Sequence, residues 1–160
     1  MRKEHKPLVL TYWNARGVEN KETNIKKKLN EIEAAFCGVS ETWTYKADKS
    51  LSDRSWKWTT GPEGRPNNRG EGPARGLGAL TDRRQITASR LDMGKYTQWD
   101  RIETTGAKPL VVGTGYFPQA QDTAGHRAAN NELLQFLNEF RLQGYDIVFG
   151  GDLKSHMGAN

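Results

Sequence analysis

Residues 8–41 read LVLTYWNARGVENKETNIKKKLNEIEAAFCGVSE. Two short apolar runs, which end on Asn14 and on Ser40-Glu41, are typical of buried strands. Residues 20–33 lie between them and repeat apolar side chains at helical spacing with lysines opposite, which predicts an amphipathic helix. Because such a unit forms a right-handed crossover, both strands should be parallel, and their polar ends should meet at one edge of a sheet.

The second half of the chain repeats this arrangement. Residues 109–116 form a strongly strand-like run, residues 123–142 predict a helix, and residues 145–149 predict a buried strand that runs into Asp152. The apolar stripe of the predicted helix is Leu133, Leu134, Phe136, Leu137 and Phe140. Either Asp122 or Thr123 can cap its start, and Gly144 fits the position after its end.

The middle of the chain predicts shorter strands that are joined by polar turns. These strands are expected at residues 56–59, 76–81, 86–91 and 100–104. A loop rich in Gly, Pro and Arg is expected at residues 61–75. Strands and helices in this order predict one α/β domain over residues 1–160.

Composition limits the classes of function. The chain has a net charge of +5, which favours polyanionic partners such as DNA or RNA. It has no apolar stretch long enough to cross a membrane, so no membrane partner is expected. The lone Cys37 lies in an apolar run, which argues against a disulfide scaffold and for a reducing intracellular compartment, nuclear or cytoplasmic.

Four polar residues stand at predicted strand ends: Asn14, Glu41, Tyr116 and Asp152. Carboxylates at strand ends are suitable hard-oxygen ligands for Mg²⁺ or Mn²⁺, and such a metal supports attack on a phosphodiester. Each residue alone has an ordinary structural alternative. Glu41 could be a surface acid, Asn14 and Asp152 could be turn residues, and Tyr116 could be a packing aromatic. Their occurrence in one order favours a common site.

The four motifs together resemble the endonuclease/exonuclease/phosphatase (DNase I-like) superfamily, and they are most similar to the endonuclease domains of non-LTR retrotransposons. The motifs are Trp13-Asn14, Ser40-Glu41-Thr42, Tyr116-Phe117-Pro118 and Gly150-Gly151-Asp152. The resemblance implies a four-layer α/β sandwich, with two mixed sheets covered by helices. It also implies a DNA endonuclease that depends on Mg²⁺ or Mn²⁺, with RNA as an alternative substrate.

The resemblance also implies a role for each residue. Glu41 would bind the metal, and Asn14 would assist in positioning the metal and the phosphate. Tyr116 would contact the scissile phosphate, and Asp152 would orient or activate the attacking water. Lys154 occupies a place where the family usually has asparagine, and a lysine there should weaken metal occupancy, pair with Asp152 or grip a phosphate.

A second departure concerns histidine. The family carries a late Ser-Asp-His segment, which none of His5, His126 and His156 matches, so the sandwich is expected to be incomplete at its C-terminal end. The two departures leave other hypotheses open. The chain could be a nucleic-acid-binding module with impaired catalysis, half of a complemented enzyme, or a phosphatase of the same fold. An exposed sheet edge would favour a homodimer or a complementing chain.

Nucleic-acid contacts are predicted from the basic loop and one tryptophan. The arginines in question are Arg65, Arg69, Arg75, Arg83 and Arg84, of which the first three lie in the loop itself. They could track a phosphate backbone, or they could belong to a solvated loop and a polar turn. Trp43 could stack on a base or pack in the core.

Overall fold

A computed structural model describes residues 7–42, 51–62, 65–66, 73–74, 76–104, 106–119 and 121–153. The elements are β1 (Leu10–Asn14), α1 (Glu22–Glu31), β2 (Phe36–Ser40), β3 (Trp56–Thr60), β4 (Arg65–Pro66), β5 (Pro73–Ala74), β6 (Leu77–Asp82), β7 (Thr87–Met93), β8 (Thr97–Glu103), β9 (Leu110–Tyr116), α2 (Thr123–Leu142) and β10 (Asp146–Asp152). One sheet has the order β1-β2-β6-β3, and the other has the order β10-β9-β8-β7. Strands β4 and β5 pair with each other.

The first strand–helix–strand unit forms as predicted. Strands β1 and β2 are parallel, and their register pairs Asn14 with Ser40. Helix α1 buries Ile25 and Leu29 against this sheet, beside Trp56 and Trp58. Ile32 was expected on the same face, but it follows the end of the helix and is 44% exposed.

The second parallel unit joins β9 and β10 through α2. Their register pairs Asp152 with Tyr116. Helix α2 begins and ends where predicted: the Asp122 side chain caps the Gly125 amide, and Gly144 adopts a positive φ of 84° just past the end. Phe140 packs on Trp99 of β8, whereas Leu134, predicted as part of the apolar stripe, is 57% exposed because it lies outside the face that meets the sheet.

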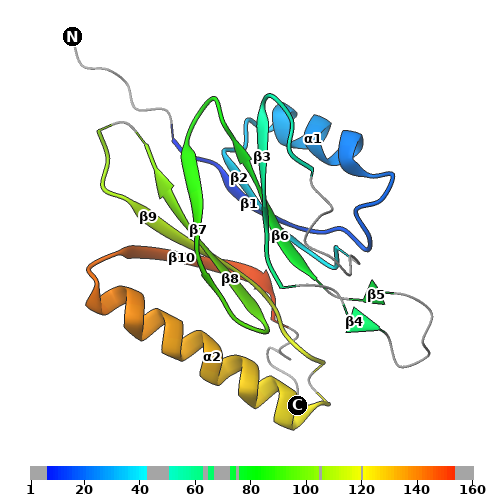
Figure 1. The fold of residues 1–160 in the computed structure, drawn as a ribbon, viewed down its shortest axis with the longest axis vertical. Coiled ribbons are helices and arrows are strands. Elements are labelled where there is room, and N and C mark those ends of the chain that lie inside the picture. Colours follow the sequence, from blue (N-terminus) through cyan, green and yellow to red (C-terminus); the bar gives the residue numbers. More distant parts are fainter. Residues whose placement is uncertain are drawn as a thin grey trace.

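The layers form a four-layer sandwich, as predicted. Figure 1 shows α1 and α2 on opposite sides of the molecule, with the two sheets between them. One apolar cluster fills the space between the sheets and includes Phe36, Ala79, Ile102 and Val112. The sheets approach so closely at Gly38 that a β-carbon there would lie 2.3 Å from the Thr114 hydroxyl oxygen of the opposite sheet.

The layer between the sheets also contains a buried acid. Asp100 of β8 is fully buried, and its Oδ2 accepts a hydrogen bond from Gln98 Nε2 at 3.1 Å. The same Gln98 nitrogen donates to the Thr59 carbonyl of the other sheet at 3.1 Å. Burial raises the pKa of Asp100 to about 7, against the opposing effects of Gln98, Arg90 and Lys57.

Strands β1 and β10 are the end strands of their sheets and border an opening between them. Leu10, Tyr12 and Val148 line a cavity of about 150 Å³ there. Val148 is 43% exposed, although its neighbour Phe149 packs into the core beside α2. The inter-sheet core is therefore open along the β1 and β10 edges in the described part of the chain.

Neither described helix has the length and hydrophobicity that crossing a membrane requires. Cys37 is a free, buried thiol in β2, and burial raises its pKa to about 12. A thiol with that pKa is almost entirely protonated at neutral pH, so Cys37 is a core residue rather than a nucleophile.

Candidate active site

Three of the predicted residues meet where the two sheets end. Tyr116 of β9 donates its hydroxyl proton to Glu41 Oε1 at 3.1 Å, which links the second sheet to the end of β2. Asp152 lies opposite Tyr116 in the β9–β10 register. The charges of Asp152 and Glu41 both raise the pKa of the Tyr12 hydroxyl.

Glu41 has an unusual backbone conformation. Its φ is 52°, in the left-handed region that non-glycine residues rarely adopt, at a cost of about 1–3 kcal/mol. The loop between β1 and α1 holds it there, because Gly17 donates its backbone N–H to the Glu41 carbonyl at 2.6 Å and Val18 donates to the Thr42 carbonyl at 3.2 Å. Strain of this kind persists where the surroundings fix it, and it is typical of functional positions.

The position before Asp152 requires glycine, because the backbone conformation and the close neighbouring strand leave no room for a side chain. Gly151 has a φ of 146°, and a β-carbon there would lie 2.1 Å from the Gly115 carbonyl oxygen. Only glycine lets β10 approach β9 so closely at this point. Phe117 then donates its backbone N–H to the Asp152 carbonyl at 2.8 Å, so the two strand exits are tied together.

Tyr12 and Ser40 belong to the same cluster and were not predicted as site residues. The Tyr12 hydroxyl is hydrogen-bonded to Ser40 Oγ. Burial, with smaller contributions from the nearby Asp152 and Glu41 and against the opposing effect of Ser40, raises the pKa of Tyr12 to about 12, so the phenol stays protonated. Tyr12 lies two residues before Asn14, on the same face of β1, and this strand period is the signal that could have found it.

Asn14 lies at the same sheet edge, but its side chain takes part in a local turn. Its Oδ1 accepts a hydrogen bond from the Arg16 backbone N–H at 3.2 Å. This is the turn role that the sequence had offered as the alternative. Its assistance to a metal or phosphate stays a prediction.

Several predicted residues lie outside the described residues or away from the cluster. Trp43, Arg69, Arg75 and Lys154 are outside the described residues, as are His5 and His156, and Arg65 is described only as part of β4. Arg84 follows β6 at the end that pairs with the start of β2, far from Glu41 in register, and it pairs with Asp82 at 2.8 Å. The predicted contact of Arg84 with nucleic acid stays a prediction, beside the alternative of a polar turn.

Glu41 and Asp152 are the residues of the cluster that could hold a divalent cation. No group of three or more His, Cys, Asp and Glu side chains gathers in the described part of the chain, so a fully protein-built cage is absent there. Mg²⁺ is usually held by one or two carboxylates, with waters and substrate phosphate completing its shell. Glu41 and Asp152 offer hard oxygen donors of this kind.

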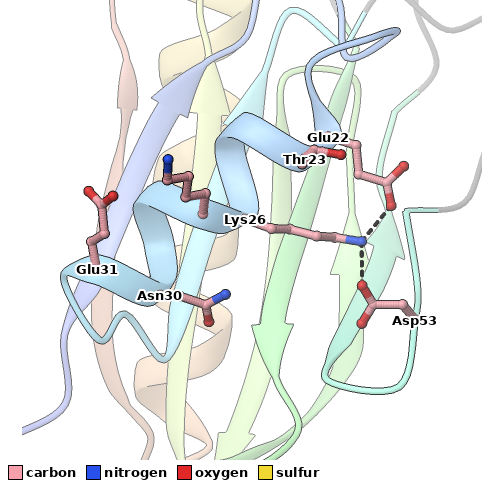
Figure 2. A pocket seen from close by; sticks show the side chains of 7 residues that line it. Glu22, Thr23, Lys26, Asn30, Glu31 and Asp53 are labelled. Atoms are coloured by element: carbon pink, nitrogen blue, oxygen red, sulfur yellow. Dashed lines mark hydrogen bonds and ion pairs between the residues drawn. The ribbon is translucent and has the colours of Figure 1, made fainter.

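A groove of about 760 Å³ beside α1 serves a different purpose (Figure 2). Lys26 crosses it and donates to Glu22 at 2.5 Å, to the Leu51 carbonyl at 2.6 Å and to Asp53 at 2.8 Å. These bonds use all three ammonium hydrogens, so Lys26 fastens α1 to the chain that enters β3. The groove is a structural junction, and neither Glu41 nor Asp152 is among the residues that line it.

Comparison with solved structures identifies the fold. No known protein family matches the sequence, and no curated protein does. The chain superposes on D. rerio TDP2, solved with a single-strand DNA product, with a TM-score of 0.67, 13% identity and coverage of 94% of this chain and 62% of that one. The chain superposes on the endonuclease domain of TRAS1, a telomere-specific non-LTR retrotransposon, with a TM-score of 0.63 and 13% identity. This match covers 94% of this chain and 61% of that one. A Bacteroides thetaiotaomicron mannosyl-6-phosphatase matches with a TM-score of 0.65 and 8% identity, over 96% of this chain and 67% of that one.

The chain spans less than two thirds of the length of TDP2 and of the TRAS1 domain. Within that span, the two mixed sheets and the covering helices agree with the sandwich that the motifs implied. The described chain therefore has the fold of the DNase I-like endonuclease/exonuclease/phosphatase proteins.

Proposed function

We propose that this protein is a phosphodiesterase that depends on Mg²⁺ or Mn²⁺ and cleaves DNA as an endonuclease. The observation that carries the proposal is the junction of Glu41, Tyr116 and Asp152 where the two sheets end. The fold is shared with phosphoester hydrolases, among them a retrotransposon endonuclease domain and a TDP2 solved with DNA. The net charge of +5 also favours a polyanionic substrate.

Each residue has a role in this proposal. Glu41, assisted by the Asn14 amide oxygen, holds the cation, which when bound neutralises the phosphate and the leaving oxygen. Tyr116 contacts a phosphate oxygen through its hydroxyl, and Asp152 orients the attacking water or accepts its proton. Tyr12 stays protonated and keeps its hydrogen bond to Ser40 within the cluster. We propose that Arg65, Arg69, Arg75 and Trp43 contact the DNA.

A plasmid-nicking assay tests this function. The 160-residue chain is expected to convert supercoiled plasmid to the nicked form with Mg²⁺ or Mn²⁺ and to stop when EDTA is added. A parallel assay with a sugar phosphate distinguishes the phosphatase alternative, which the similarity to a mannosyl-6-phosphatase favours. Phosphate release without nicking would replace the endonuclease by the phosphatase, and neither activity would remove the enzymatic proposal for this chain.

Lys154 favours a second candidate, a DNA-binding module with impaired catalysis. Its ammonium stands two residues after Asp152, where it would compete with a divalent cation for that carboxylate. This candidate predicts DNA binding that weakens steeply with salt, because released counterions drive it, together with no nicking. A gain of nicking in Lys154→Asn at unchanged DNA affinity would instead place the chain among the enzymes.

We also propose that a second copy of the chain pairs along the open β1 and β10 edges. Strand edges with unpaired backbone groups and exposed apolar side chains favour pairing. Light scattering after size exclusion is expected to give a dimer, and Val148→Lys is expected to give a monomer. Leu142→Lys removes another exposed apolar side chain, on α2, and should leave the dimer intact. A wild-type monomer would contradict this arrangement.

A further inference from the structure

We infer that His126 of α2 is a positioning residue that fixes Asp152 in the candidate active site. His126 Nε2 lies 3.0 Å from the Leu153 carbonyl oxygen, one residue beyond Asp152. Its Nδ1 lies 3.2 Å from Asn130 Nδ2, one turn along the same helix. The ring therefore links the outer helix layer to the chain that leaves β10.

The two hydrogen bonds together define the state of the ring. A carbonyl oxygen only accepts, so Nε2 must carry a proton and donate it to Leu153. The Asn130 amide nitrogen donates, so Nδ1 must accept. Both ring nitrogens of His126 thus have hydrogen-bond partners, and the orientation of the ring is fixed from two sides.

Ring packing extends the connection to the neighbouring strand. The His126 ring meets the Phe117 ring edge-on, with centroids 5.6 Å apart and planes at 83°. Phe117 is buried, follows Tyr116 directly and donates its backbone N–H to the Asp152 carbonyl at 2.8 Å. His126 therefore contacts both chain exits that carry site residues, Tyr116 through Phe117 and Asp152 through Leu153.

Helix α2 is held in place independently of His126. The Glu132 carboxylate accepts from the Lys95 and Tyr96 backbone amides at 2.7 and 3.0 Å, and from the Thr97 hydroxyl at 2.7 Å. Tyr96 in turn accepts the Tyr116 backbone N–H at 3.0 Å. Because Glu132 anchors the helix to β8, loss of the His126 side chain should release the Asp152 exit without releasing α2.

Amide hydrogen exchange at Phe117 tests this inference directly, since that amide is bonded to the Asp152 carbonyl. His126→Phe keeps an aromatic ring against Phe117 but removes the donor to Leu153, so Phe117 exchange is expected to rise about tenfold, which is the loss of one hydrogen bond. His126→Gln retains an N–H donor and should restore most of the protection. Gln135→Ala, on the exposed side of α2, should leave Phe117 exchange unchanged.

The kinetic consequence rests on the proposed function, whereas the exchange measurement does not. A misplaced Asp152 should lower kcat about tenfold to a hundredfold in His126→Phe, with KM for DNA unchanged, and His126→Gln should recover it. Unchanged Phe117 exchange in His126→Phe would overturn the inference, as would raised exchange with wild-type kcat. If the wild-type chain shows no nicking, the nuclease proposal fails. The role of His126 is then tested by the Phe117 exchange measurement alone. If His126→Phe does not fold, full Phe117 protection in His126→Gln supports the inference, and loss of protection there contradicts it.

Discussion

Replacing Glu41 by glutamine is expected to lower metal-dependent nicking by at least about a hundredfold. Glutamine keeps the size of the side chain and can still hydrogen-bond Tyr116, but it removes the negative charge that a hard cation requires. A metal supplies several kcal/mol of transition-state stabilisation, and each 1.36 kcal/mol corresponds to about tenfold in rate. The loss should appear in kcat and in Mn²⁺ affinity together.

The measurement pairs nicking rates with Mn²⁺ titration by calorimetry. Glu139→Gln makes the same chemical change at an exposed position of α2 and should behave as wild type in both assays. Thermal unfolding should show that Glu41→Gln is folded, because the φ of 52° and the loop bonds to its backbone are retained. Wild-type Mn²⁺ affinity in Glu41→Gln would remove Glu41 from the metal site.

The strand–helix–strand units were predictable because they depend on local pattern. Apolar runs and helical spacing set β1, α1 and β2, and the parallel register then brought Asn14 level with Ser40. The same reasoning located α2 and its Asp122 cap. The end of α1 was predicted less well, because Ile32 belongs to the helical period but the chain turns away before it.

The junction of the site was only partly predictable, because it depends on how two separate sheets stack. No sequence period relates Glu41 to Tyr116, 75 positions apart, and only the stacking brings their side chains together. Tyr12 was missed, although it lies two residues before Asn14 on the same face of β1. Arg84 lies at the opposite end of its sheet from Glu41, because the antiparallel return of β6 carries it there.

The free energy of unfolding should fall as pH rises, because the pKa of Asp100 is raised in the folded protein. The pKa of Asp100 is about 7 in the folded protein and about 3.8 when the chain is unfolded, because burial between the sheets disfavours the charged form. Between these values the folded state binds the extra proton, so the free energy of unfolding falls as pH rises from about 4 to about 7 and then levels off. At about 1.36 kcal/mol per unit, the full loss is at most about 4 kcal/mol.

Asp100→Asn should remove that dependence and stabilise the protein at alkaline pH. Asparagine keeps an oxygen that can accept from Gln98 Nε2, and it needs no charge in a layer where Asp100 Oδ1 and Gln98 Oε1 are both buried without a hydrogen-bond partner. Urea unfolding should give a variant about 2–4 kcal/mol more stable than wild type at pH 8 but nearly equal to it at pH 4.

An exposed aspartate provides the control for Asp100→Asn, and two nearby cations define the result that would contradict it. Asp146→Asn makes the same change at an exposed position and should shift stability by less than about 0.5 kcal/mol at either pH. Arg90 and Lys57 oppose the effect of burial on Asp100. If Asp100→Asn were less stable than wild type at pH 8, those two cations would be holding the carboxylate charged between the sheets, and the pH dependence would reverse. Desolvation is expected to prevail because Asp100 is fully buried and Lys57 already donates to the Ala88 carbonyl at 2.5 Å.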